Sequence, residues 1–186
     1  METKNTKRAR ELLTEVLGIY SSGNFGRVGE LLVEATAQLV LPCDDYHLMS
    51  NVILPAGEKK IEIDLLVLSQ FGVFVIEVKT KLGLIGGKAN TKTWSKVALN
   101  GTRSRFPNPC CQNKRQIGVI RKLLDIPANE IHPLVVFAGQ VELKDGIPEN
   151  VIYANDLVQR IKLSKQRVIK KKTIKDAVKT IEDTRL

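Results

Sequence analysis

The sequence has few cysteines and histidines, and this scarcity excludes several kinds of site. Its three cysteines, Cys43, Cys110 and Cys111, are odd in number, include a neighbouring pair and show no CxxC spacing. Neither a disulfide framework nor a zinc site is therefore expected. The two histidines, His47 and His132, lie far apart in the chain, and no nucleophile elbow or Ser-His-Asp order is present. The chemistry of this protein should depend on other side chains.

The chain also lacks a long apolar run. No stretch approaches the ~20 residues that a membrane-spanning helix needs, and the N-terminus has no apolar signal core of the secretory type. We therefore expect a cytoplasmic protein without a membrane partner. Its 186 residues, 43% hydrophobic and 26% charged, are enough for one domain with a real core and an additional helix at either end.

Acidic residues are missing from one long stretch near the C-terminus. From Leu157 to Lys175 the chain contains no acid, and its basic residues there are Arg160, Lys162, Lys165, Arg167, Lys170, Lys171, Lys172 and Lys175. They contribute much of the net charge of +9. Such a run attracts polyanions by counterion release, or it forms a solvated helix face. The charge alone does not choose between these interpretations.

The hydrophobic pattern predicts a mixed α/β domain, with a central mixed β-sheet flanked by helices. Helices are expected over residues 3–20, 25–39, 110–124, 154–162 and 173–183, and strands over residues 47–54, 61–68, 72–79, 94–99, 132–138 and 151–153. Short connections between the first three strands favour an antiparallel meander. The glycines at 83, 86 and 87 predict turns, and residues 102–109 predict a loop.

Three segments are expected along the chain. An N-terminal helix occupies residues 1–22, the core domain occupies residues 23–163, and a basic helical extension occupies residues 164–186. Gly29 lies inside a predicted helix, where glycine costs ~1 kcal/mol relative to alanine. We therefore expect Gly29 to mark a place of close packing or close backbone approach.

Two apolar strands carry ionisable residues where apolar ones are expected. Residues 61–79 read IEIDLLVLSQFGVFVIEVK, and they contain Asp64, Glu77 and Lys79. Burying a carboxylate costs several kcal/mol unless a cation or hydrogen bonds compensate it. Because side chains alternate across a strand, Glu77 and Lys79 share one face. If the two strands pair, Asp64 can face Glu77 near the end of the sheet.

A divalent cation would relieve the repulsion between two such carboxylates. Mg²⁺ takes oxygen ligands from one or two carboxylates and keeps waters or substrate phosphates. A lysine beside it can stabilise the attacking water and the charge that develops on a phosphate. The structural alternative is an ion pair in which Lys79 neutralises Glu77. This short pattern alone leaves both interpretations open.

Five motifs follow one another between Phe25 and Ala138. They are GxxGE at Gly26–Glu30, EID at Glu62–Asp64, GVFVIEVK at Gly72–Lys79, Trp94, and NPxxQN at Asn108–Asn113. In this order and spacing they resemble the nuclease-related domain (NERD) family, a branch of the PD-(D/E)XK nuclease superfamily. The resemblance implies a restriction-endonuclease-like core and a metal-dependent nuclease that hydrolyses the phosphodiester bonds of nucleic acid.

The resemblance also assigns roles to single residues. Asp64 and Glu77 correspond to the metal-binding acids, and Lys79 corresponds to the active-site lysine. Glu30 corresponds to the acid presented by the first core helix, a further metal ligand. These assignments imply Mg²⁺ or Mn²⁺ as the cofactor. Without the resemblance, both Glu30 and Glu34 are interpreted as exposed helix acids.

Gln112 corresponds to the glutamine on the helix that follows the core strands, where it would position water, the lysine or a phosphate. In related exonuclease-like branches this glutamine begins a QxxxY pattern. Here Gln116 stands in place of the tyrosine, so this chain departs from those branches. Glu62 shares the face of Asp64, where it either supports the site or points to solvent. Trp94 either stacks a nucleic-acid base or packs in the core.

Basic residues are expected to hold the nucleic-acid backbone. The candidates are Arg103, Arg105, Lys114, Arg115, Lys170, Lys171 and Lys172. Backbone contacts carry little sequence information, so we expect a weak sequence preference, with DNA rather than RNA as the substrate. Many nucleases of the superfamily act as dimers or within larger assemblies, which makes a homodimer or larger assembly a further expectation.

Two alternatives to a nuclease are left open by the sequence. The chain can be a nucleic-acid-binding module that keeps the nuclease fold without turnover, as the basic run would allow. It can also be an interaction protein in which Asp64, Glu77 and Lys79 form structural ion pairs. Only the nuclease hypothesis predicts metal-dependent cleavage that depends on Asp64 and Lys79.

Overall fold

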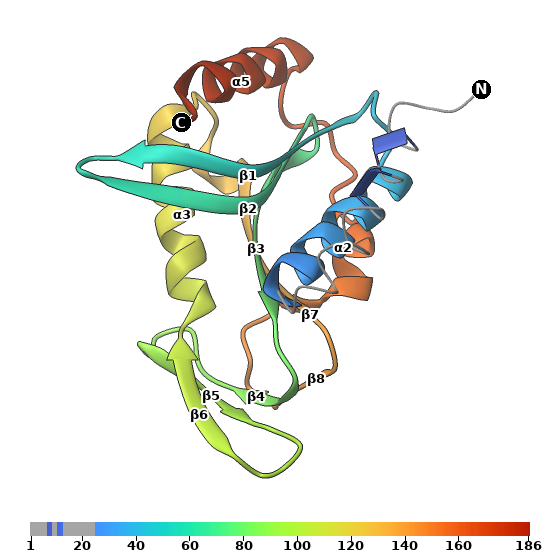
Figure 1. The fold of residues 1–186 in the computed structure, drawn as a ribbon. Coiled ribbons are helices and arrows are strands. Elements are labelled where there is room, and N and C mark those ends of the chain that lie inside the picture. The colour runs from blue at the N-terminus through green and yellow to red at the C-terminus, as the bar shows by residue number, and fades with distance from the viewer. Residues whose placement is uncertain (1–6, 9–10, 13–24) are drawn as a thin grey trace.

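A five-stranded sheet forms the centre of the protein (Figure 1). The computed structural model describes residues 7–8, 11–12 and 25–186, so most of the predicted helix over residues 3–20 lies outside the described residues. The strand order is β1 (Tyr46–Ala56), β2 (Lys59–Ser69), β3 (Gly72–Thr80), β7 (Ile131–Ala138) and β9 (Val151–Tyr153). The predicted strands over residues 47–54, 61–68, 72–79, 132–138 and 151–153 are confirmed.

The sheet is mixed because its two halves are connected differently. Strands β1, β2 and β3 pair antiparallel, as the short connections predict. The turn between β2 and β3 is fastened by Ser69, whose hydroxyl donates to the Gly72 carbonyl at 2.8 Å and accepts the Phe71 N–H at 3.2 Å. Strands β3, β7 and β9 pair parallel, which requires long crossover connections.

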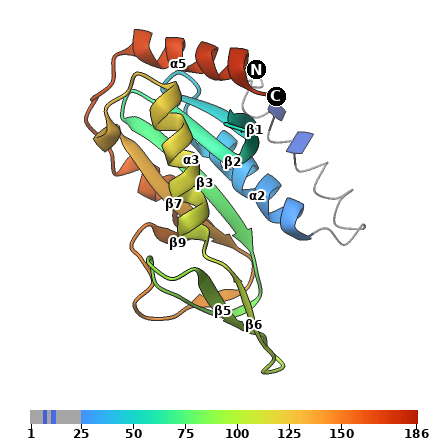
Figure 2. The same ribbon diagram turned by 90° about the vertical axis from the view of Figure 1, so that its left-hand side faces the viewer.

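Helices cover both faces of this sheet (Figure 2). On one face α3 (Pro109–Leu123) and α5 (Lys171–Thr184) pack on Leu66, Val73 and Val75. On the other face α2 (Phe25–Val40) and α4 (Leu157–Lys162) pack on Phe74, Ile76 and Val78. Two short 3-10 helices, η1 (Ala128–Glu130) and η2 (Ala154–Asp156), directly precede β7 and α4. The mixed α/β class with a helix-flanked sheet is confirmed.

A second sheet of four strands was not predicted. Its order is β6 (Arg103–Pro107), β5 (Thr93–Val97), β4 (Gly83–Gly86) and β8 (Val141–Leu143). The predicted turns around residues 83–87 and the predicted loop over residues 102–109 are therefore wrong where β4 and β6 form. Both strands are short and contain glycine or proline, and they are held by antiparallel pairing with β5 rather than by an alternating apolar pattern.

Trp94 attaches the second sheet to the central one. Its side chain is 1% exposed and stacks on Phe137 of β7, with ring centroids 6.3 Å apart. Its indole N–H donates to the Lys88 carbonyl at 3.1 Å. The core interpretation of Trp94 is therefore confirmed, and a base-stacking role is excluded by its burial.

Asn108 fixes the start of α3. Its side-chain oxygen accepts the Cys110 N–H at 2.9 Å, which satisfies one of the free amides at the helix N-terminus. Its amide nitrogen donates to the Lys88, Ala89 and Thr91 carbonyls. Asn108 thereby joins α3 to the loop before β5 and sets the position of the helix over the sheet.

No helix among the described residues has the length and apolar character that a bilayer crossing requires.

Gly29 allows α2 to lie directly against the end of β3. A Cβ atom at this position would overlap Thr80 Oγ1 and crowd the Cβ atoms of Thr80 and Ala138. The Thr80 hydroxyl also donates to the Gly26 carbonyl at 3.2 Å. The close packing predicted for Gly29 is confirmed, and it places the neighbouring Glu30 beside the end of the sheet.

We predict that Gly29→Ala destabilises the protein, because the added methyl group must push α2 away from β3. The expected loss in the free energy of unfolding is about 1–3 kcal/mol, measured by urea unfolding. Gly118→Ala is the matched control. A Cβ atom at Gly118 meets nothing within 4 Å, so this change should stabilise α3 by up to about 1 kcal/mol. Equal effects of the two substitutions would contradict the packing argument.

Candidate active site

The pairing of β2 with β3 ends at the two predicted acids. The ladder runs from Ser69 opposite Gly72 to Leu65 opposite Ile76, and the same register places Asp64 across from Glu77. At this point β2 separates from β3, and the Val78 N–H donates to Asp64 Oδ2 at 2.6 Å instead of to a strand carbonyl. The predicted pairing of the two strands is confirmed.

A cavity of about 600 Å³ opens where the two strands separate. Elements β1, β2, β3, α2 and α3 contribute to its walls, and the residues predicted for the active site all line it: Glu30 from α2, Asp64 from β2, Glu77 and Lys79 from β3, and Gln112 from α3. The fold thus gathers at one place side chains that are distant in the sequence. Their roles in catalysis remain predictions.

Glu77 is the most enclosed acid of the cavity, with 4% of its surface exposed. Its Oε1 forms an ion pair with Lys79 Nζ. Its Oε2 accepts a hydrogen bond from Gln116 Nε2 at 2.5 Å. Each carboxylate oxygen of Glu77 therefore has a partner, and these contacts compensate the burial of its charge.

Gln116 is a site residue that sequence analysis missed. Its Nε2 also donates to the Glu62 carbonyl at 2.8 Å, and its Oε1 accepts from Asn113 Nδ2 at 3.0 Å. Asn113 donates in addition to the Val75 carbonyl at 2.9 Å. This chain of hydrogen bonds turns the NH₂ group of Gln116 toward Glu77. The sequence signal that could have identified Gln116 is its amide three residues after that of Asn113, which places both on the sheet-facing side of α3.

The pKa of Asp64 is raised from 3.8 to about 7. Burial is the largest cause, and repulsion by the Glu77 carboxylate adds to it. The hydrogen bond from the Val78 N–H, the next largest influence, acts in the opposite direction, while Glu30 raises and Lys79 lowers the pKa to smaller extents. One lysine therefore does not neutralise the acids of this cavity.

Glu30 reaches the cavity but is engaged elsewhere. Its side chain is 29% exposed, and Oε2 lies 3.2 Å from Arg27 Nη1. The same Arg27 nitrogen donates to Asn51 Oδ1 at 2.6 Å. Arg27 thus pairs with one oxygen of the Glu30 carboxylate, while the negative charge of Glu30 contributes to the raised pKa of Asp64.

The structure also tests the predicted exposure of two other acids, Glu62 and Glu34. Glu62 is exposed, as its solvent-facing interpretation predicts, and it also lines the cavity beside Asp64. The interpretation of Glu34 as an exposed acid is wrong. Glu34 is 4% exposed, and its Oε1 lies 3.3 Å from Arg8 Nη2. The ion pair with Arg8, which is distant in the sequence, compensates the cost of burying the Glu34 carboxylate.

The donor atoms at this cavity fit a hard divalent cation. Asp64 and Glu77 offer carboxylate oxygens, the ligand type that Mg²⁺ and Mn²⁺ prefer, with remaining positions left for water or phosphate. The raised pKa of Asp64 marks a place where an additional positive charge would be stabilising. Among the described residues, no group of three or more His, Cys, Asp and Glu side chains is arranged to hold a metal. The fit therefore rests on Asp64 and Glu77, and Glu30 lines the same cavity.

The predicted nucleic-acid-binding residues are spread over the surface. Arg115 of α3 lines the cavity, together with Lys59 and Lys60 of β2. Arg103 and Arg105 lie on β6, while Lys170, Lys171 and Lys172 lie at the start of α5. Strand β6 and helix α5 lie at opposite ends of the protein (Figures 1 and 2). Lys114 lines a different cavity, on the other side of α3.

Comparison with known proteins gives one family and one relative of interest. The profile of the nuclease-related domain matches residues 25–138, a range that holds every residue predicted for the active site. The chain is 29% identical, over 138 residues, to an uncharacterized protein of Bacillus anthracis. The matched region covers 71% of this chain and 63% of that protein, so the chain spans less than two thirds of the relative's length. No solved structure matches the chain.

The raised pKa of Asp64 predicts how stability depends on pH without divalent metal. Between pH 3.8 and about 7 the folded protein retains a proton that the unfolded chain has released. Stability should therefore fall as the pH rises through this window, and above the folded pKa the loss is complete. Asp64→Asn removes the charge and keeps an oxygen for the Val78 N–H. It should stabilise the protein at about pH 8 by on the order of 1 kcal/mol or more.

Urea unfolding of wild type and Asp64→Asn in EDTA, at about pH 4 and about pH 8, measures this effect. The gain should be small at the lower pH, where Asp64 is protonated in the fold. An equal gain at both pH values, or a loss at the higher one, would contradict the raised pKa.

Proposed function

Because the chain belongs to the nuclease-related domain family, we propose that it is a metal-dependent nuclease that hydrolyses phosphodiester bonds of nucleic acid. The observation that carries the proposal is the position of Asp64 across from Glu77 in a cavity that also holds Lys79. Two neighbouring acids in apolar strands are costly to a purely structural protein. They are useful in an enzyme that binds a cation and a phosphate between them.

Asp64 and Glu77 would hold Mg²⁺ or Mn²⁺, and Glu30, which lines the same cavity, would be a further ligand. Bound there, a divalent cation would supply Lewis-acid chemistry, polarising the scissile phosphate and lowering the pKa of a water. Lys79, now paired with Glu77, would turn its ammonium group toward the phosphate charge that develops during the reaction. Gln116 would hold Glu77 in position through its hydrogen bond. Gln112 lines the cavity and can contact water or phosphate.

The substrate we propose is DNA, held through its backbone with weak sequence preference. Lys59, Lys60 and Arg115 line the candidate active site and supply positive charge next to the acids. Contacts of such residues to phosphate fix the position of a nucleic acid and do not read its bases. Arg103, Arg105 and the lysines at 170–172 would extend the contact area only for a long substrate.

A nucleic-acid-binding module without turnover is the second candidate function. The observation that favours it is the state of Glu77, whose two oxygens are occupied by Lys79 and Gln116. A binding module would keep this ion pair permanently. A nuclease would exchange it for a cation when substrate and metal bind.

Cleavage of plasmid DNA and of oligonucleotides in Mg²⁺ and in Mn²⁺ distinguishes the two candidates. We predict that wild type cleaves only with divalent metal, and that Asp64→Ala and Lys79→Ala reduce the rate at least 100-fold, about the size expected for losing one charged catalytic group. Metal-dependent cleavage that survives both substitutions would point to another site or a contaminant. Salt-dependent binding without any cleavage would select the binding module.

Gln112 and Gln116 form a matched pair for the same assay, since they lie one helical turn apart and both line the cavity. Gln116→Leu leaves the buried Oε2 of Glu77 without its hydrogen-bond donor and should lower both stability and cleavage. Gln112→Leu removes no side-chain hydrogen bond of the described structure and should lower cleavage alone. If Gln116→Leu left stability unchanged, the hydrogen-bond chain through Asn113 would not support the site.

A further inference from the structure

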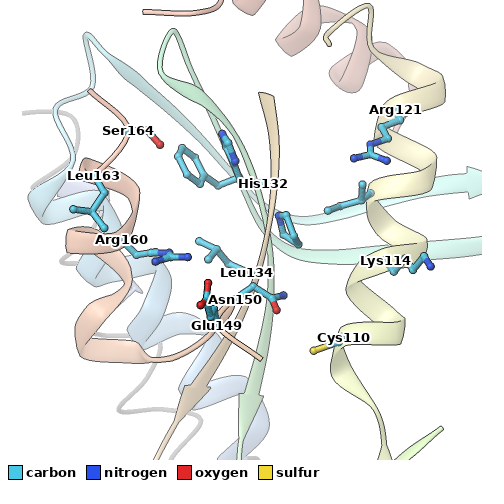
Figure 3. A pocket seen from close by; sticks show the side chains of 13 residues that line it. Cys110, Lys114, Arg121, His132, Leu134, Glu149, Asn150, Arg160, Leu163 and Ser164 are labelled. Carbon is cyan, nitrogen blue, oxygen red and sulfur yellow. The ribbon is translucent and has the colours of Figure 1, made fainter. Parts of the chain in front are cut away.

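A second cavity, of about 880 Å³, lies on the other side of α3 from the candidate active site (Figure 3). It forms because β9 pairs only with Val135, Val136 and Phe137 of β7. The first half of β7 therefore has no strand beside it on this edge. Helix α3 and helix α4 stand on the two faces of the sheet and wall the open edge on both sides.

Another strand is not a suitable occupant of this edge. Pro133 lies in the uncovered half of β7, and proline has no N–H to offer a pairing strand. Proline at a sheet edge blocks strand addition. A ligand in the second cavity must therefore be held by side chains.

The side chains that reach the second cavity favour an anion. Arg121 of α3 and Arg160 of α4 point into it from opposite walls (Figure 3), and Lys114 lines it as well. Glu149 is the one acid among the lining residues. The side chains of Lys114 and Arg160 form no hydrogen bond or ion pair with another described residue, while Arg121 donates to the Ala128 carbonyl at 3.1 Å. His132 and Asn150 add further polar groups to the lining.

Helix α3 separates the second cavity from the candidate active site. Lys114 and Arg121, seven residues apart, face the second cavity, whereas Gln112 and Arg115 face the active site. The helix contains no acidic residue. Its outer surface thus presents positive charge continuously from one cavity to the other.

Gly118 lies at the middle of that outer surface. It follows Lys114 by four residues and precedes Lys122 by four, which are the spacings of neighbours on a helix surface. A Cβ atom here would meet nothing within 4 Å, and Gly118 is not among the glycines with positive φ. Neither packing nor backbone conformation accounts for a glycine that weakens the helix. A ligand that approaches the helix backbone closely would account for it.

We propose that the second cavity binds backbone phosphates of the same nucleic acid whose scissile phosphate lies in the candidate active site, and that the nucleic acid crosses α3 over Gly118. This inference rests on the proposed function and adds the path of the substrate. The three basic side chains of the second cavity match the repeated negative charge of a phosphodiester backbone. The smooth surface at Gly118 allows that backbone to pass between the two sites.

Binding without turnover tests the path. Wild type, Lys114→Gln and Arg160→Gln are titrated in EDTA, at several salt concentrations, with single- and double-stranded oligonucleotides of about 16 nucleotides. Lys179→Gln, which removes the same charge from an exposed position of α5, is the control. Each variant of the second cavity should reduce the salt dependence of binding by about 0.7 to 0.9 in the slope of log K against log salt, the value for one phosphate contact. The control should not.

Gly118→Ala and Gly118→Gln test the crossing point. Both should leave the melting temperature equal or higher, since alanine and glutamine favour helix over glycine. Gly118→Gln should nevertheless weaken binding several-fold, because its side chain would stand in the path of the backbone, while Gly118→Ala should change binding little. Equal binding by wild type and Gly118→Gln would overturn the crossing.

Two further outcomes would overturn the assignment of the second cavity. One is an unchanged slope for Lys114→Gln and Arg160→Gln with both kinds of oligonucleotide, or a change equal to that of Lys179→Gln. The other is a mononucleotide that binds wild type and not Arg160→Gln, yet does not displace the oligonucleotide. Cleavage that depends on Asp64 and Lys79 would then still support the proposed function, so the two proposals can fail separately.

Discussion

The separation of β2 from β3 at Asp64 is the constraint on which the candidate active site depends. Up to Leu65 the two strands pair normally, and then the Asp64 carboxylate takes the Val78 N–H that a strand carbonyl would otherwise accept. This exchange opens the cavity and holds Asp64 across from Glu77. It also keeps Asp64 in a place where burial and repulsion raise its pKa. The acids are thus positioned by backbone geometry before any ligand binds.

Helix α3 lies beside this opening and contributes residues both to the candidate active site and to the second cavity. Asn108 fixes its start, and the hydrogen bonds of Asn113 and Gln116 fix its rotation against β3. With that rotation, the buried amides of α3 support Glu77 while its outer surface presents Arg115 and Gly118. A shift of α3 along its axis would disturb both surfaces together, which couples the proposed chemistry to the proposed path of the substrate.

Much of the fold could be predicted from residues with strong local patterns. The apolar runs predicted β2 and β3, the short connection between them predicted their antiparallel pairing, and helical spacing predicted α2 and α3. Strands β4, β6 and β8 could not be predicted, because their stability comes from neighbours in the second sheet rather than from their own pattern. Gln116 was missed for a related reason: its contact with Glu77 depends on how α3 is rotated. Glu34 was placed wrongly because its burial depends on Arg8, which is distant in the sequence.

The central claim is that Asp64 and Glu77 form a cation site, and a calorimetric titration with Mg²⁺ and with Mn²⁺ tests it most directly. Wild type should bind the cation through these two acids and gain thermal stability by ligand linkage. Asp64→Asn keeps the hydrogen bond to Val78 and should lose both the binding heat and the gain in melting temperature. Equal metal binding by wild type and Asp64→Asn, or no binding by wild type, would contradict the account.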